Sequence, residues 1–392
     1  MKILIVSDVL GEENNGTTVA AMNLIRYLKS QGHDVRILCP DQDKRGQDGY
    51  FIVKTLSLGK LIDNYVAKVG VALAKPEKDV IEQAMEGVDL VHVMLPFALG
   101  TAAVKMAKKK GIPVTAGFHC QAENFTSYIK LNHLKFVNHL VYKYMYRQVY
   151  RHVNAIHYPT KFIKDIFESH IRKQTNGYII SNGVNRSVKK KPVEKPAELK
   201  DKFIILSTGR YAREKSQDTI LKAVALSKHK DEIQIILAGQ GTKEKFYKQL
   251  AQKLNLKPIF KFFNRDEIVD VLNYSDMYVH PAEMELEGIA CLEAIACGKL
   301  VIVSSSKLSA TKGFAIDDKC IFKNRNPRDL ARVIDYFIEH KNECLEYGQK
   351  YLSESEIFNQ DECMERMEKM MKEVCSFAHK GKTDRLLLGS IK

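Results

Sequence analysis

Short apolar runs alternate with helical patterns along this chain of 392 residues, in two separate series. The first series opens with a β-branched apolar run at residues 2–7, a helical pattern at 19–29 and another apolar run at 35–39, which together predict a β-α-β unit. Repeated units of this kind form a parallel sheet with helices on both faces. The sequence therefore predicts an α/β fold with two doubly wound halves that face each other across a cleft.

A charged segment that contains two prolines separates the two series. Residues 189–196 read Lys-Lys-Lys-Pro-Val-Glu-Lys-Pro and lack the periodicity of a core element, so we interpret this region as an interdomain linker. The chain is also too long for one ordinary core, which favours two domains. In chain order we expect an N-terminal domain, a linker, a C-terminal domain, a helix and a flexible tail: residues 1–188, 189–201, 202–358, 359–380 and 381–392.

Net charge is spread unevenly along the chain. Residues 1–200 hold 30 Lys and Arg against 18 Asp and Glu, a net charge of +12, whereas residues 201–392 have a net charge of +2. If the protein meets an acidic surface, its first half is expected to make that contact.

Composition and the first residues indicate the compartment. No apolar run approaches the roughly 20 residues of a membrane span, and Asp8 lies where a signal peptide would still be apolar. The eight cysteines include no Cys-x-x-Cys pair, so we expect them to be reduced and the protein to be cytoplasmic.

Two glutamates in the C-terminal half carry the best indication of function. Glu285 lies in the loop after an apolar strand, and Glu293 lies in the helical pattern that follows Gly288. The helix carboxylate can accept two hydrogen bonds from a vicinal diol, while the amides of Gly288 and Ile289 point toward an anion at the helix start. This pattern is typical of a nucleotide-sugar site. Two solvated acids are the alternative, although Glu293 lies in an apolar run where a carboxylate needs partners, and Glu287 is a rival for the loop role.

A second candidate anion site lies between the first predicted strand and helix of the C-terminal domain. Gly209 permits close approach of the backbone, Arg210 offers a forked cation, and Lys215 adds a point charge beside the helix N-terminus. Two cations and one helix end match a diphosphate, although a solvated turn has the same composition. Because this loop and the Glu285 loop both follow strands, we expect them at the same edge of the sheet.

Two weaker signals lie in the N-terminal domain. Gly16 follows the first strand and opens a helix, so its turn could contact a phosphate or an acceptor. His119 lies just past a strand end, on the ligand-bearing side of an open α/β sheet. A purely structural histidine fits the spacing of His119 equally well.

Taken in order along the chain, these features resemble a family 4 retaining glycosyltransferase of the GT-B fold. The motifs that carry the resemblance are the Gly16 turn, Gly32-His33, His119, Ser181-Asn182-Gly183-Val184, Gly209-Arg210 with Glu214-Lys215, and the Glu285/Glu293 pair. The glutamate motif of that family usually reads Glu-Gly-Phe-Gly, whereas this chain has Glu-Leu-Glu-Gly at residues 285–288. The spacing from Glu293 selects Glu285 as the counterpart of the first glutamate.

The resemblance implies two Rossmann-like domains that face a central cleft, with the C-terminal helix returning toward the N-terminal domain. It also implies a transfer from a nucleoside diphosphate sugar that retains the anomeric configuration and needs no metal or other cofactor. In that reaction Arg210 and Lys215 would stabilise the leaving diphosphate, Glu285 would contact the donor sugar, and His119 would lie near its far edge. The other implied donor contacts are the Glu293 carboxylate on the ribose hydroxyls and the amides around Gly16 and Gly288.

A basic, aromatic segment of the N-terminal domain indicates the acceptor. No acidic residue occurs between Glu123 and Asp165. Spacings of four residues from position 135 to 151 predict one cationic ridge along a helix, beside an apolar ridge formed by Leu134, Val137, Val141 and Tyr144. Such a helix can lie on an anionic bilayer, although it could also pack its apolar side on the domain and keep its basic side in water. The residues expected to meet the anionic membrane surface are Lys130, Lys135, Lys143, Arg147 and Arg151.

This segment and the residues that follow Gly288 are similar to those of bacterial diacylglycerol glucosyltransferases. We therefore expect an enzyme at the inner face of the cell membrane that transfers a hexose, with UDP-glucose as the expected donor and 1,2-diacylglycerol as the expected acceptor. The alternatives are a polysaccharide or polyprenol-linked glycan acceptor, a sugar-nucleotide epimerase, and a nucleic-acid-binding protein. Nucleic-acid binding would leave Glu285, Glu293, Arg210 and Lys215 without a role.

Overall fold

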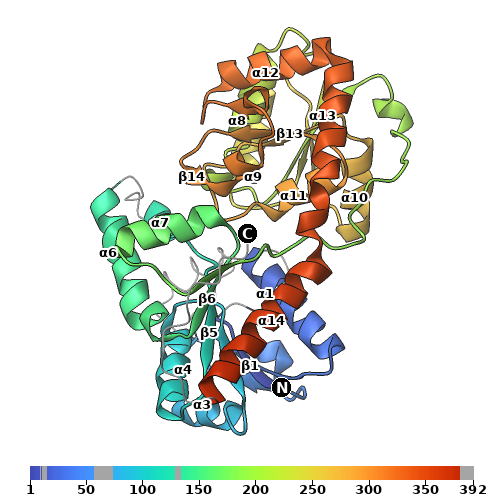
Figure 1. Ribbon diagram of the computed structural model, residues 1–392. Helices are drawn as coiled ribbons and strands as arrows, with labels where there is room; N and C mark the ends of the chain where they lie inside the picture. The colour runs from blue at the N-terminus through green and yellow to red at the C-terminus, as the bar shows by residue number, and fades with distance from the viewer. Residues whose placement is uncertain (9, 11–15, 57–73, 129–133, 380–392) are drawn as a thin grey trace. The chain divides into compact units, whose positions relative to one another are not determined.

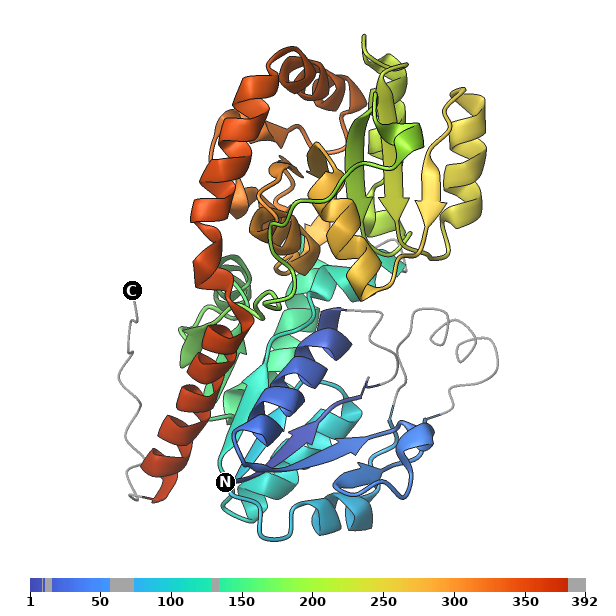
Figure 2. The ribbon, with the colours of Figure 1, turned by 90° about the vertical axis from the view of Figure 1, so that its right-hand side faces the viewer.

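The computed structural model describes residues 1–8, 10, 16–56, 74–128 and 134–379, and the chain divides into two compact units. The first unit comprises Met1–Asn182 and Cys363–Lys392, and the second comprises Gly183–Glu362. Each unit is built on its own parallel β-sheet with helices packed against it (Figure 1, Figure 2). The prediction of an α/β chain with two doubly wound domains is confirmed.

The sheet of the first unit contains seven described strands in the order β3-β2-β1-β4-β5-β6-β7, and every neighbouring pair is parallel. The strands are β1 Lys2–Val6, β2 Asp34–Cys39, β3 Tyr50–Ile52, β4 Leu90–Val93, β5 Val114–Gly117, β6 Ala155–Tyr158 and β7 Gly177–Ile179. The order reverses between β1 and β4, and the carboxyl ends of strands beside such a switch point form a ligand-binding crevice in open α/β sheets.

The helices of the first unit include one from the end of the chain. They are α1 Gly16–Ser30, α3 Lys78–Ala84, α4 Ala98–Lys109, α5 Ala122–Tyr128, α6 Lys135–Gln148, α7 Lys161–Ile171 and α14 Gln360–His379. α14, red in Figure 1, begins with the last residues of the second unit and continues in the first unit from Cys363. His33 Nε2 lies 2.6 Å from the Glu368 carboxylate of α14, and four methionines of this helix are buried, so its packing on the first unit is both polar and apolar.

The sheet of the second unit has six described strands in the order β10-β9-β8-β11-β13-β15, again all parallel. They are β8 Phe203–Thr208, β9 Ile233–Ala238, β10 Ile259–Lys261, β11 Met277–His280, β13 Leu300–Ser304 and β15 Ile321–Phe322, with a separate pair formed by β12 Met284–Glu285 and β14 Leu308–Ser309. The order reverses between β8 and β11. The carboxyl ends of these two strands therefore form the switch point of the second unit.

Two helices of the second unit, α10 and α12, begin at residues whose side chains satisfy their free amides. They are α8 Asp218–Leu226, α9 Glu244–Lys253, α10 Arg265–Tyr274, α11 Ile289–Ala296, α12 Pro327–Glu339 and α13 Lys341–Ser353. Asn264 and Glu267 form a capping box at the start of α10, and the Asn326 side chain caps α12, whose first residue is a proline. Residues 189–196 form no helix or strand, and the backbone of Lys189 and Lys191 is hydrogen-bonded to the Asn273 side chain of α10.

Candidate functional site

Two loops meet at the switch point of the second unit. One follows β8 and contains residues 209–217, and the other follows β11 and contains residues 281–288. The Glu283 amide donates a hydrogen bond to the Glu214 carbonyl oxygen at 2.7 Å, which joins the two loops through their backbones. The expectation that both loops lie at one edge of the sheet is confirmed.

Lys215 and Glu285 form an ion pair across these loops. The Lys215 Nζ lies 2.5 Å from Glu285 Oε2, and the two side chains are only 22% and 16% exposed. Lys215 ends the 3-10 turn Arg213–Lys215, just before α8, and Glu285 ends β12. Burial raises the pKa of Glu285, but the Lys215 charge and a hydrogen bond from His280 outweigh it and bring the pKa to about 2. Glu285 is therefore ionised at neutral pH and can accept hydrogen bonds from hydroxyl groups.

Arg210 has an acidic partner of its own in the first loop. Its Nη2 donates to Glu214 Oε1 at 3.0 Å, and its carbonyl oxygen accepts a hydrogen bond from the Gln217 side chain at 3.1 Å. Gly209 next to it has a φ of +142°, in the region that favours glycine. A Cβ at Gly239 would lie 2.1 Å from the Gly209 carbonyl oxygen, so the loop after β9 can pack on this backbone only because Gly239 has no side chain.

The helix α11 begins beside Glu285. Its N-cap residue, Gly288, has a φ of +89°, and a Cβ there would lie 2.5 Å from the Thr311 side chain and 3.2 Å from Glu285 Cγ. Glycine is therefore required for this close approach. The first amides of an α-helix, which start here at Ile289, have no acceptor within the helix and can bind an anion.

Glu293 lies in the second turn of α11 and differs from Glu285 in its surroundings. Burial raises the pKa of the Glu293 carboxyl, and the charge of Arg265 offsets only part of this effect. Among the described residues, no side chain or backbone amide forms a hydrogen bond or ion pair with this carboxylate. Its oxygens are therefore available to a ligand.

One polar residue of this site was missed by the sequence analysis. His280 ends β11, is 2% exposed, and its Nε2 lies 3.3 Å from Glu285 Oε2. His280, like His119, is a histidine at the carboxyl end of a parallel strand, which is the ligand-bearing side of an open α/β sheet. The signal was therefore present in the sequence.

Gly16 and His119 lie close together at one edge of the first unit. The Thr17 hydroxyl, at the start of α1, lies 3.5 Å from the His119 carbonyl oxygen, at the outer limit of a hydrogen bond. Gly16 is exposed, and Gly117 leaves room for the buried His119 imidazole, because a Cβ at Gly117 would lie 2.3 Å from its Nε2. Burial, with a contribution from His157 and His92, lowers the pKa of His119 well below its usual value. His119 is therefore neutral at pH 7.

The helix α6 carries most of the predicted basic surface. Lys135 and Arg147 are exposed and Lys143 is half-buried, whereas Arg151 lies on the 3-10 turn Tyr150–His152 that follows the helix. Lys130 lies outside the described residues. The prediction of a single helical ridge extending to Arg151 is therefore wrong at its C-terminal end.

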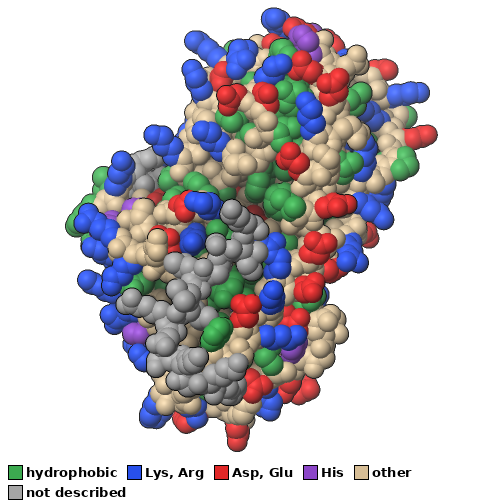
Figure 3. Space-filling model, in the orientation of Figure 1, with side chains coloured by type: hydrophobic (Ala, Val, Ile, Leu, Met, Phe, Trp, Pro, Cys, Tyr) green, Lys and Arg blue, Asp and Glu red, His purple; other side chains and the backbone are tan. Residues whose placement is uncertain are grey.

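The apolar side of α6 also differs from the prediction. Asn138, Tyr142 and Met145 face the unit, and the Tyr142 hydroxyl donates to the buried Glu123 carboxylate at 2.7 Å. Val137 and Val141 are half-buried. The large apolar side chains that α6 and its N-cap residue expose are Leu134, Phe136, Leu140 and Tyr144, at 51%, 70%, 49% and 61%. Basic and apolar side chains thus share the outer surface of α6, as Figure 3 shows at the left of the view. None of the described helices has the length and apolarity needed to cross a bilayer.

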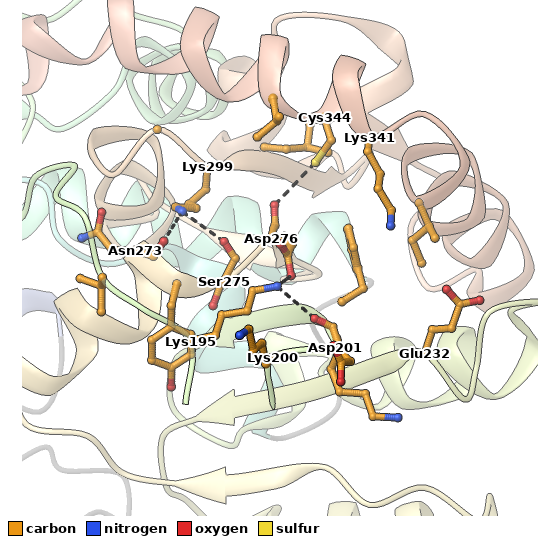
Figure 4. A pocket seen from close by; sticks show the side chains of 18 residues that line it. Lys195, Lys200, Asp201, Glu232, Asn273, Ser275, Asp276, Lys299, Lys341 and Cys344 are labelled. Atoms are coloured by element: carbon orange, nitrogen blue, oxygen red, sulfur yellow. Dashed lines mark hydrogen bonds and ion pairs between the residues drawn. The ribbon is translucent and has the colours of Figure 1, made fainter. Parts of the chain in front are cut away.

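A cavity of about 680 Å³ lies at the other edge of the second sheet, near the amino ends of β8, β11 and β13 (Figure 4). Two lysines that line the cavity already have partners within the protein. Lys195 Nζ lies 2.6 Å from the Asp276 carboxylate, and Lys299 Nζ donates to the carbonyl oxygens of Asn273 and Ser275. We therefore place the functional site at the carboxyl edge rather than in this cavity. Among the described residues, no group of three side chains suited to hold a metal ion is present.

Two family models match consecutive parts of the chain. Residues 14–188 match Glycosyltransferase Family 4, and residues 188–351 match Glycosyl transferases group 1. The division between these matches lies close to the division between the two units.

Several known proteins are similar to this chain. An α-monoglucosyldiacylglycerol synthase of Streptococcus pneumoniae is 24% identical over 319 residues, which cover 77% of this chain and 70% of that protein. A synthase of the same name from Acholeplasma laidlawii is 23% identical over 367 residues, which cover 85% and 87%. The solved structure of Anabaena HepE in complex with UDP has the same fold, with a TM-score of 0.75 at 15% identity over 95% of this chain and 100% of that chain. These matches confirm the resemblance, and this chain belongs to the family 4 glycosyltransferases of the GT-B fold, where it is similar to diacylglycerol glucosyltransferases.

Proposed function

We propose that this hexosyltransferase moves glucose from UDP-glucose to 1,2-diacylglycerol, with retention of configuration and without a metal ion. The observation that carries the proposal is the Lys215–Glu285 ion pair at the switch point of the second unit, with Arg210 and Glu293 at the same edge. The names of the two synthases support glucose as the sugar and diacylglycerol as the acceptor. Both names also specify an α-linked product, and UDP-glucose is itself an α-glucoside, so the same outcome here requires retention.

In the proposed reaction, Lys215 and Arg210 bind the diphosphate of the donor. Negative charge grows on the leaving phosphate oxygen as its bond to the sugar C1 breaks, and preorganised cations stabilise that charge most. The ammonium group of Lys215 has three N–H donors, so it can contact the diphosphate while it still contacts Glu285. Glu285, ionised and next to the start of α11, accepts hydrogen bonds from the hydroxyls of the sugar.

The acceptor hydroxyl then attacks C1 from the face that the diphosphate leaves. One C–O bond forms to the acceptor while the C–O bond to the phosphate breaks, and the hydroxyl proton passes to the departing phosphate oxygen. Configuration is retained because attack and departure share one face, and no side chain has to form a covalent intermediate. Gly16 and His119 are proposed to contact the donor from the first unit, Gly16 through backbone amides and His119 as a neutral hydrogen-bonding group near the sugar.

A UDP-release assay tests the proposal as a whole. Purified enzyme with UDP-glucose is expected to release UDP only when vesicles supply diacylglycerol, equally with and without EDTA, and to yield an α-glucosyl lipid by NMR. Release that requires a polyprenol-linked or polysaccharide acceptor would overturn the lipid assignment, and strict dependence on magnesium would overturn the metal-independent mechanism.

The Glu293→Ala variant is expected to bind UDP about 10- to 100-fold more weakly, because two hydrogen bonds from ribose hydroxyls to a carboxylate are lost. Isothermal titration with UDP and with 2′,3′-dideoxy-UDP measures the effect. The wild-type protein should prefer UDP strongly, and the variant should bind the two ligands almost equally. The exposed Glu346→Ala on α13 is the matched control. Unchanged UDP affinity in the Glu293 variant would show that the ribose assignment is wrong.

We also propose that α6 attaches the enzyme to an anionic membrane at the inner face of the cell membrane. The double variant Lys135→Gln/Arg147→Gln is expected to bind anionic vesicles about 30-fold more weakly, since each basic residue near such a surface contributes about 1 kcal/mol. Sedimentation with anionic and neutral vesicles measures this. The exposed pair Lys108→Gln/Lys109→Gln on α4 removes the same charge from another helix of the unit. Equal losses in both double variants would show that α6 has no special role.

A further inference from the structure

His280 is buried at the end of β11 and joins two groups of polar side chains. Its Nε2 lies 3.3 Å from Glu285 Oε2, the same oxygen that receives Lys215. Its Nδ1 lies 3.3 Å from the Tyr278 hydroxyl, which lies 2.9 Å from the Thr208 hydroxyl at the end of β8. The imidazole also stacks on the Tyr278 ring, at 6.1 Å between centroids. His280 therefore links the ends of both switch-point strands to the Glu285 carboxylate.

The donors and acceptors of this chain of contacts are consistent with a neutral imidazole in one tautomer. A carboxylate only accepts, so the His280 Nε2 carries the hydrogen and donates it to Glu285. The Nδ1 of a neutral imidazole then accepts, which makes the Tyr278 hydroxyl the donor and leaves its oxygen to accept from Thr208. Tyr278 thus fixes the tautomer of His280 that Glu285 requires.

We propose that His280 is a positioning residue for the transfer reaction, which holds Glu285 in place when Lys215 divides its N–H donors between Glu285 and the diphosphate of the donor. This inference rests on the proposed function. Lys215 and His280 share Glu285 Oε2, but only Lys215 has a competing partner in the reaction. His280 lies on a fully buried strand and cannot follow the ligand. It therefore keeps one carboxylate oxygen fixed while the remaining lone pairs face the sugar hydroxyls.

Loss of the contact between His280 and Glu285 should affect turnover more than it affects the affinity for the donor. Most of the affinity for the donor is expected from the diphosphate and the ribose, which His280 does not contact. The orientation of the sugar toward the acceptor depends on Glu285. Loss of His280 should therefore lower kcat and leave the affinity for UDP unchanged.

Three variants test whether His280 affects kcat without affecting the affinity for UDP. His280→Leu removes the donor to Glu285, His280→Gln replaces Nε2 with an amide nitrogen that can donate to the same oxygen, and Tyr278→Phe removes only the hydroxyl that fixes the tautomer. His229→Leu is the matched control, because His229 also contacts a glutamate, Glu232, but precedes the amino end of β9. Turnover with UDP-glucose and diacylglycerol, KM for UDP-glucose, UDP affinity and the melting temperature are measured for each variant.

We expect kcat of His280→Leu to fall about 10- to 100-fold, by analogy with the loss that follows removal of a group that orients a metal ligand. KM and UDP affinity should stay within about twofold, His280→Gln should recover most of the turnover, and Tyr278→Phe should lie between them. If His280→Leu fails to fold, Tyr278→Phe alone must still lower kcat without changing UDP affinity. Normal kcat in folded His280→Leu or in Tyr278→Phe would overturn the inference while leaving the proposed function intact. A wild-type protein without turnover would instead overturn the proposed function.

Discussion

Lys215→Ala is expected to lower kcat about 100- to 1,000-fold, the loss that follows removal of one preorganised group that stabilises transition-state charge. The reason lies in where the charge appears. The diphosphate gains negative charge only as the glycosidic bond breaks, so a cation beside it stabilises the transition state more than the bound donor. KM for UDP-glucose should therefore rise much less than kcat falls. Steady-state kinetics of UDP release at saturating diacylglycerol measure both values.

Two further variants separate charge from the loss of a side chain. Lys215→Arg keeps the charge on a different shape and should retain more turnover than Lys215→Ala. Lys222→Ala removes a lysine of the neighbouring helix α8, where it pairs with Asp218 at 2.6 Å, and should leave turnover unchanged. Turnover of Lys215→Ala within threefold of wild type would contradict the assignment of Lys215 to the leaving group.

The strands that the sequence predicts well are those buried on both faces. β1, β8 and β13 are apolar runs with almost fully buried side chains, and such runs identify central strands of a parallel sheet. β6 and β7 were not predicted. Each has only three or four residues, and β6 carries the polar His157 in its run, so its strand character depends on tertiary packing rather than on local sequence.

The C-terminal end of α6 could not be deduced from spacing alone. Its helix ends at Gln148 because Val149 leaves the helical conformation and Tyr150 is buried, with its hydroxyl donating to the Gly117 carbonyl oxygen at 3.2 Å. This contact joins residues 33 positions apart, which no helical periodicity records.

The candidate functional edge of the second unit could be predicted because each residue follows from its place beside a strand or helix end. Arg210, Lys215 and Glu285 all lie in loops after parallel strands, and this position alone places them at one edge. The pairing of Lys215 with Glu285, rather than with Glu287, depends on the short β12–β14 pair that sets the direction of the loop. No two-residue strand gives a usable signal in a sequence.

Three buried histidines are expected to reduce the stability of the first unit as the pH falls. Burial lowers the pKa of His92 to about 3 and that of His157 to about 4, and it lowers the pKa of His119 well below its usual value. His92 Nδ1 lies 2.9 Å from the Thr115 hydroxyl, His157 Nε2 donates to the Ile180 carbonyl oxygen at 2.6 Å, and the rings of His119 and His157 are 5.5 Å apart. No carboxylate is among these contacts to stabilise an added charge.

The direction of the effect follows from the depressed pKa values. In the unfolded chain the three imidazoles titrate near pH 6.5, whereas in the folded unit His92 and His157 stay neutral to about pH 4 or below. Between these values the unfolded chain binds protons that the folded unit does not, so the stability that these histidines contribute is fully present above pH 6.5 and falls as the pH decreases. At pH 5 His92 and His157 should each cost about 2 kcal/mol, and His119 acts in the same direction. Asp8 acts in the opposite direction, because burial raises its pKa to about 7 and the folded unit therefore binds a proton there that the unfolded chain does not.

Chemical denaturation between pH 7.5 and pH 5 measures this loss, and His157→Gln identifies its source. The glutamine amide can still donate to the Ile180 carbonyl oxygen but cannot take up a proton. The variant should therefore lose about 2 kcal/mol less stability than the wild type over this pH range, whatever its stability at pH 7.5. An equal slope in the wild type and in His157→Gln would show that the His157 imidazole accepts a proton without unfolding the unit.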